Sequence, residues 1–90
     1  MLASALFLTS EEERIVRVLQ ETAAKLDGAE GEVVLDFSSV RRIQSGALRA
    51  LEDFARIADG KAVKIVLHHV NVDVYKVLKL VKLTGVSFLH

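Results

Sequence analysis

Short apolar runs alternate with amphipathic segments of helical periodicity along the chain of 90 residues. Strands are expected at 2–8, 33–35, 62–67 and 86–89, and helices at 11–26, 47–58 and 72–83. This alternation predicts an α/β fold with a mostly parallel or mixed four-stranded sheet, right-handed crossovers and about three packed helices. Because neither a linker nor a repeat divides the sequence, residues 1–90 are expected to form a single domain.

Three local patterns add detail to this prediction. Ser10 and Glu13 have the spacing of a capping box, and the apolar positions after them predict a helix of about four turns. Residues 33–35 are apolar without alternation, which is typical of a strand covered on both faces. The segment 72–83 is apolar almost all round. Its exceptions are Lys76, Lys79 and Lys82, which are interpreted as a solvated face.

Composition excludes several classes of function. Twelve basic residues balance twelve acidic ones, so no global field draws the chain to nucleic acid or to an anionic membrane. The absence of cysteine excludes disulfides, thiolate zinc sites and thiol catalysis, and it fits a reducing compartment. The first apolar run is short and leads directly into three glutamates, which predicts neither a signal peptide nor a membrane span. We therefore expect a cytoplasmic protein without cofactor, nucleic-acid partner or membrane insertion.

The polar residues between the strand at 33–35 and the next helix are the best candidates for function, because loops on a rigid scaffold concentrate binding and chemistry. Ser45 is interpreted first as the N-cap of that helix and alternatively as a phosphorylation site favoured by the helix dipole. Ser38 and Ser39 are typical turn formers. Asp36 either accepts backbone N–H bonds in the turn or joins an acidic site, and the turn role is preferred.

Other chemistry is not indicated. His68 and His69 are adjacent, so their side chains diverge on extended backbone and make poor partners for one metal ion. The five glycines form neither a dinucleotide-binding nor a phosphate-binding loop. No serine, histidine and aspartate occur in a nucleophile motif. Neither an enzyme nor a nucleotide binder is expected.

The stretch 32–48 resembles the STAS domain, in particular the small bacterial anti-sigma factor antagonists. In that family a hydrophobic strand ends in Asp-Leu-Ser-Gly-Val, three residues follow, and Asp-Ser-Ser-Gly-Leu opens a helix. Here Asp-Phe-Ser-Ser-Val occupies 36–40, and Gln-Ser-Gly-Ala-Leu occupies 44–48 after the same spacing. The resemblance continues to Thr-Gly-Val at 84–86, where the family usually has Ser-Gly-Leu, and it implies a STAS-like fold.

The same resemblance implies a non-enzymatic regulator of transcription. Such a protein sequesters an ATP-binding anti-sigma factor of the serine kinase type and so frees a sigma factor. In the family, the partner phosphorylates the second serine of Asp-Ser-Ser-Gly, and the phosphate breaks the complex. That position is Gly46 here, so the chain either acts constitutively or responds at Ser45. The implied partner-binding residues are Asp36, Ser38, Ser39, Gln44, Ser45, Gly46, Arg49, Glu52, Asp53 and Arg56.

A second interpretation makes the chain a STAS scaffold or accessory module of a stressosome-like complex, or of a complex that transports lipids or anions. The family usually has an N-terminal hairpin where this sequence offers one strand, which leaves a freer sheet edge for a homodimer to cover.

On the second helix, the charged residues are spaced for mutual pairing on its solvated side. These are Arg49, Glu52, Asp53 and Arg56.

Overall fold

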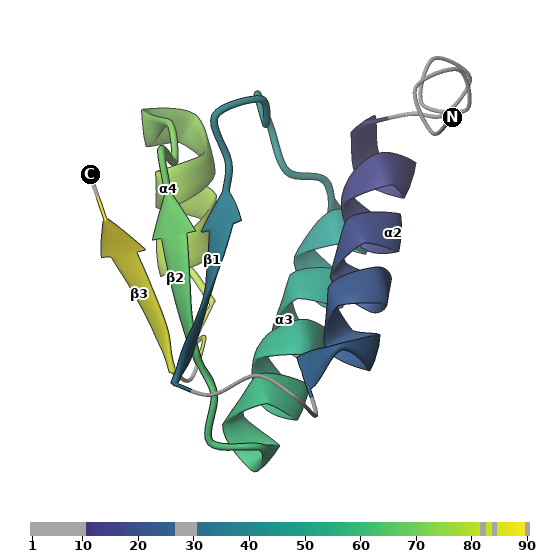
Figure 1. The fold of residues 1–90 in the computed structure, drawn as a ribbon. Coiled ribbons are helices and arrows are strands. Elements are labelled where there is room, and N and C mark those ends of the chain that lie inside the picture. The colour runs from purple at the N-terminus through teal and green to yellow at the C-terminus, as the bar shows by residue number, and fades with distance from the viewer. Residues whose placement is uncertain (1–10, 27–30, 82, 84, 90) are drawn as a thin grey trace.

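The predicted α/β class is confirmed by the computed structural model, which describes residues 11–26, 31–81, 83 and 85–89 (Figure 1). Its elements, in order, are α2 (Glu11–Ala24), β1 (Glu32–Asp36), α3 (Ser45–Gly60), β2 (Lys64–His68), α4 (Val72–Lys79) and β3 (Val86–Leu89). The strand order is β1-β2-β3, and both pairs are parallel. Within the described ranges the sheet therefore has three strands rather than four. The strand expected at 2–8 and the capping serine Ser10 lie outside these ranges.

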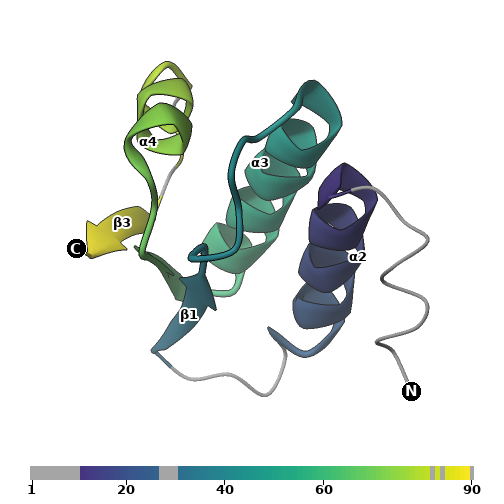
Figure 2. The same cartoon turned by 90° about the horizontal axis from the view of Figure 1, so that it is seen from above.

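All three described helices lie on one side of the sheet. The crossovers through α3 and α4 each lead to the next strand in the same direction, and crossovers of one hand then place both helices on the same face. The view from above shows α2, α3 and α4 together on that side (Figure 2). The sheet thus has an inner face packed against helices and an outer face that no described element covers.

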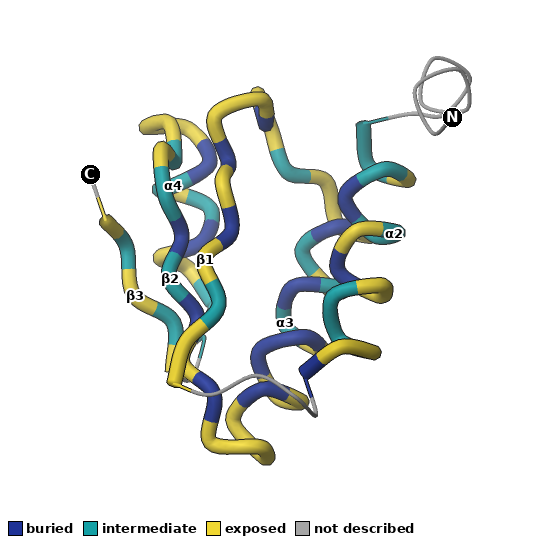
Figure 3. Tube along the Cα trace, in the orientation of Figure 1, coloured by how far each residue is buried: buried dark blue, intermediate teal, exposed yellow. Residues whose placement is uncertain are grey.

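One-sided packing overturns the expectation that residues 33–35 are covered on both faces. Leu35 points toward the helices and is 8% exposed, whereas its neighbour Val34 is 56% exposed. The burial pattern of the tube drawing shows the same alternation along β1 (Figure 3). An uninterrupted apolar sequence therefore does not mean a doubly covered strand here, because every crossover helix went to the same face.

The core lies between the inner face of the sheet and the helices α2, α3 and α4. As the periodicity predicted, α3 buries its apolar stripe, and α2 has the expected length of about four turns. Leu51 of α3 and Leu67 of β2 are completely buried. The buried residues form one cluster: Ile15, Leu19, Leu26, Leu35, Phe37, Val40, Ala47, Leu51, Phe54, Ala55, Ala58, Val63, Ile65, Leu67, Val74 and Leu78.

Helix α4 ends at Lys79, so the prediction of a helix over 72–83 was too long. Its last turn tightens: the N–H of Leu80 donates to the carbonyl of Val77, and that of Val81 to Leu78. Leu80 is 85% exposed, whereas Leu83 packs against the core from beyond the helix. Apolar residues that were predicted to belong to the helix therefore lie in the connection between α4 and β3. Across the described residues, no helix is long and apolar enough to cross a membrane.

Two substitutions test the one-sided layering. Leu67→Ala removes a side chain that is 0% exposed, and it should lower the free energy of unfolding by about 3 kcal/mol because a cavity opens in the core. Val34→Thr keeps the branched shape on the outer face and should cost less than about 0.5 kcal/mol. Urea unfolding of both variants measures the difference. Equal losses would contradict an uncovered outer face.

Candidate partner-binding surface

The loop between β1 and α3 is anchored by two buried side chains and presents polar ones. Phe37 and Val40 are buried, while Ser38 and Ser39 are exposed. The backbone N–H of Phe37 donates to the carbonyl of His68 at 2.8 Å, and the N–H of Val40 donates to the carbonyl of Phe37 at 2.9 Å. The serines are thus held outward on a tight turn, as their sequence pattern indicated.

Asp36 performs the turn role that the sequence favoured. Its Oδ1 accepts a hydrogen bond of 2.9 Å from the backbone N–H of Ser38 and lies 3.3 Å from Nδ1 of His69. Hydrogen bonds from the backbone and side chain of Ser38, followed by the contact with His69, lower the pKa of the Asp36 carboxyl below its ordinary value of 3.8. Asp36 is therefore a charged anchor of the turn.

His68 and His69 lie at this end of the sheet, beside Asp36. The rings of His68 and His69 lie 4.0 Å apart between centroids, and His69 has a positive φ of 59°. That conformation directs the His69 ring back toward the carboxylate of Asp36. In the described part of the chain, no group of three or more potential metal ligands comes together.

Asn71 joins the loop to α4, a connection that the sequence did not indicate. Its Oδ1 caps α4 by accepting from the N–H of Val74 at 2.7 Å. Its Nδ2 donates to the carbonyls of Val40 and Arg41, both at 3.0 Å. One side chain therefore satisfies a helix N-terminus and fixes the middle of the loop, which makes Asn71 a positioning residue for the surface.

The start of α3 is capped by Glu12 of α2, so the interpretation of Ser45 as the N-cap was wrong. The helix begins at Ser45, and the N-cap position is taken by Gln44, which makes no side-chain capping bond. Instead, Oε2 of Glu12 accepts from the N–H groups of Gly46 at 2.8 Å and Ala47 at 3.3 Å. A carboxylate is well placed there, because the unpaired N–H groups carry the positive end of the helix dipole.

Gly46 leaves the space that this cap occupies. A Cβ atom at Gly46 would lie 2.7 Å from Oε2 of Glu12, so the end of the flexible glutamate side chain would have to move away. Because Gly46 has no side chain, it admits the carboxylate of Glu12 at the start of α3. No local signal in the sequence reveals this pairing, because the two residues lie 34 positions apart.

The predicted surface continues from the loop along α3. Ser45, Arg49, Glu52 and Arg56 recur at intervals of four, three and four residues and form one stripe opposite the buried positions. All are exposed except Glu52, which is half-buried. Of the ion pairs expected on this helix, the structure shows the one between Arg56 and Asp53. The Nη2 atom of Arg56 lies 3.0 Å from the Oδ1 atom of Asp53.

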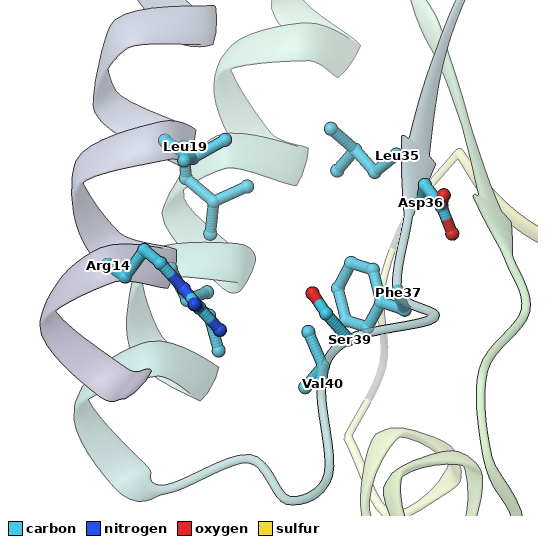
Figure 4. A pocket seen from close by; sticks show the side chains of 9 residues that line it. Arg14, Leu19, Leu35, Asp36, Phe37, Ser39 and Val40 are labelled. Carbon is cyan, nitrogen blue, oxygen red and sulfur yellow. The ribbon is translucent and has the colours of Figure 1, made fainter. Parts of the chain in front are cut away.

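Not every predicted residue belongs to this stripe. Asp53 lies to its side and lines a groove against α2 with Leu19 and Phe54. The carboxylate of Asp36 points away from the helices (Figure 4). The loop adds Arg41 and Arg42, both exposed, which were not among the predicted partner-binding residues. We define the docking surface, a candidate for partner binding, as the exposed loop residues together with the stripe on α3. Its members are Ser38, Ser39, Arg41, Arg42, Gln44, Ser45, Arg49, Glu52 and Arg56.

A cavity of about 290 Å³ separates α2 from β1 and the loop. Leu19, Leu35 and Phe37 point into it from opposite walls (Figure 4). Arg14 and Ser39 provide polar groups in its lining. The largely apolar walls suit a hydrophobic side chain better than a polar substrate.

A double-mutant cycle tests the cap on α3. Glu12→Ala should lower the free energy of unfolding by about 1 kcal/mol, because two N–H groups lose their acceptor. Gly46→Ala should give little gain in the wild type, because the new methyl displaces the carboxylate of Glu12. In the Glu12→Ala background the same change should stabilise by about 0.5 to 1 kcal/mol through helix propensity. Thermal unfolding of the four proteins measures the coupling.

Glu21→Ala is the matched control for the first change, because Glu21 is an exposed glutamate of the same helix. It should leave stability within about 0.5 kcal/mol of the wild type. If the effects of Glu12→Ala and Gly46→Ala are simply additive, the cap described above is contradicted.

Asn71→Asp separates the two roles of Asn71. The aspartate keeps an acceptor for the N–H of Val74 but brings a carboxylate against the carbonyls of Val40 and Arg41. We expect a loss of about 1 to 3 kcal/mol in stability, together with faster hydrogen exchange at the N–H of Val40. Unchanged exchange at that amide would show that Asn71 does not hold the loop.

Comparison with known proteins identifies the family to which the chain belongs. The family model described as Mlab, STAS domain matches residues 9–89, which is nearly the whole chain. Searches of curated proteins and of solved structures gave no match. STAS domains are in general regulatory, protein-binding modules without enzymatic activity. By its matched sequence, and with a fold compatible with it, the chain belongs to the Mlab, STAS domain family.

Proposed function

We propose that this protein is a cytoplasmic regulator that binds a protein partner through the docking surface and does so without a phosphorylation switch. The observation that carries the proposal is the contact between the Glu12 carboxylate and the N–H groups of Gly46 and Ala47. An anion from the chain itself thus occupies the helix N-terminus, which would otherwise stabilise a phosphate. A phosphate added at Ser45 would meet the negative charge of Glu12 there.

The partner proposed first is an ATP-binding anti-sigma factor of the serine kinase type. Support comes from the resemblance of residues 36–48 to the antagonists of such factors and from the exposure of the stripe on α3. Arg41, Arg42 and Arg49 give this end of the molecule exposed positive groups, which fit an acidic partner surface. Capture of that factor releases its sigma factor.

A second candidate is a STAS module of a stressosome-like complex or of a complex that transports lipids or anions. The observation that favours it is the description of the matching family as Mlab, which names no anti-sigma partner. The proposed docking surface is the same in both cases. The two candidates differ in the class of protein that the surface holds.

One co-purification experiment separates the candidates. The tagged protein and its Arg49→Glu variant are isolated from the native cell, and the bound proteins are identified by mass spectrometry. We expect a kinase-type anti-sigma factor with the wild type and at least about tenfold less of it with Arg49→Glu, because the substitution reverses a charge in the docking surface. A transport or stressosome component lost in the same way would favour the second candidate.

Lys25→Glu is the matched control, since it makes the same charge change at an exposed residue beyond the far end of α2. If no partner responds to Arg49→Glu more than to Lys25→Glu, the docking surface is wrong. The purified pair is then incubated with ATP. We expect no phosphate on Ser45 by mass mapping, and modification there that Ser45→Ala abolishes would refute the phosphorylation-independent mode.

A further inference from the structure

The outer face of the sheet carries an ordered pattern of charged and apolar side chains. The residues on this face are Glu32, Val34 and Asp36 from β1, Lys64, Val66 and His68 from β2, and Ser87 and Leu89 from β3. Val34 in the middle of β1 is 56% exposed, its neighbour Val66 in β2 is half-buried, and no described element covers the outer face of the sheet (Figure 2). Such an exposed apolar centre with a charged rim is typical of a surface that meets another protein.

The charges are sorted by strand. Along β1 an acidic residue stands on either side of Val34, and along β2 Lys64 and His68 stand on either side of Val66. The register of the parallel pair sets Glu32 beside Lys64, Val34 beside Val66, and Asp36 beside His68. Within the described chain no ion pair joins Glu32 to Lys64. Their charges remain available to a second molecule.

We propose that this face binds a second copy of the same chain, face to face, about a two-fold axis parallel to the strands. This axis places β1 of one copy over β2 of the other at the same height. Glu32 then faces Lys64 of the second copy, Val34 faces Val66, and Asp36 faces His68. Each contact occurs twice, because a two-fold interface is self-complementary.

The charge pattern distinguishes this arrangement from its alternative. A two-fold axis perpendicular to the strands would lay β1 over β1, which brings Glu32 against Asp36 of the second copy. It would likewise lay β2 over β2 and bring Lys64 against His68. Like charges would then meet at β1, at a cost in binding free energy. Only an axis parallel to the strands that runs between β1 and β2 pairs each acidic residue with a basic residue or an imidazole. The same axis placed along β2 would set Lys64 against Lys64 of the second copy.

The size of the face sets the strength of the dimer. With β1 over β2, two strands of each copy overlap and β3 stays outside the contact. Strands about 4.8 Å apart that rise about 3.3 Å per residue give this contact a size of roughly 10 Å by 15 Å, which is smaller than a standard protein interface. We therefore expect a weak, reversible dimer that salt weakens further. The sequence had suggested self-association at a sheet edge, whereas the structure places the complementary pattern on the sheet face.

Charge reversal tests the proposal. Sedimentation equilibrium at low ionic strength should show association of the wild type at protein concentrations up to about 1 mM. Glu32→Lys and Lys64→Glu should each weaken association about tenfold, because each puts like charges together twice. An equimolar mixture of the two variants should associate at least as tightly as the wild type, since one copy then carries two positive groups and the other two negative ones. The double variant should also regain self-association.

Glu21→Lys on α2 is the matched control and should leave association unchanged. Thermal unfolding confirms that every variant is folded. A wild type that stays monomeric up to about 1 mM would overturn the proposal. So would single variants that associate as tightly as the wild type, or a mixture that does not recover, because another surface would then be responsible. Glu32 and Lys64 begin their strands, at the end of the sheet away from the docking loop, so these results are distinct from the loss of a partner in Arg49→Glu.

Discussion

The contact between the carboxylate of Glu12 and the first N–H groups of α3 holds together the end of the molecule that carries the proposed docking surface. It joins α2, which packs along α3, to the point where the loop from β1 becomes helix. The dipole of α3 needs a negative group at this position, and the chain supplies one from a neighbouring helix rather than from the residue before Ser45. As a result the orientation of the docking stripe depends on how α2 lies against α3. A partner that engages Ser45 and Arg49 would therefore meet a helix N-terminus whose positive dipole end already faces the carboxylate of Glu12.

The one-sided arrangement of helices divides the remaining surface into regions with separate roles. The inner face of the sheet is consumed by the core, in which Leu67 and Leu51 are completely buried. The loop after β1 emerges where the strands end, as is general for open parallel sheets. The outer face stays uncovered because successive crossovers of one hand never return a helix to it. The proposed docking surface lies on the loop and α3, whereas the proposed self-association surface lies on the strands. The two surfaces thus share no helix.

Local patterns in the sequence were enough to predict the order of the described elements, the buried stripe of α3 and the turn held by Asp36. These features depend on residues within one or two turns of each other, where periodicity and turn chemistry act directly. The cap from Glu12 and the clamp from Asn71 could not be predicted, because their partners lie 34 and about 30 positions away and only the folded chain brings them together. The exposure of Val34 escaped prediction for a related reason. Whether an apolar strand is covered once or twice depends on where the crossover helices go, and its own composition does not record that.

The proposed dimer has a consequence for the docking surface. A two-fold axis parallel to the strands leaves the strands of both copies pointing the same way, so both loops after β1 emerge at the same end of the assembly. Two copies of Arg41 and Arg49 would then face one side, at a fixed separation. A partner that itself carries two binding sites would be held by both loops, and its second contact would form within a complex already assembled. A weak dimer is well suited to this role, because the partner's own symmetry would stabilise it in return through the linkage between binding and assembly.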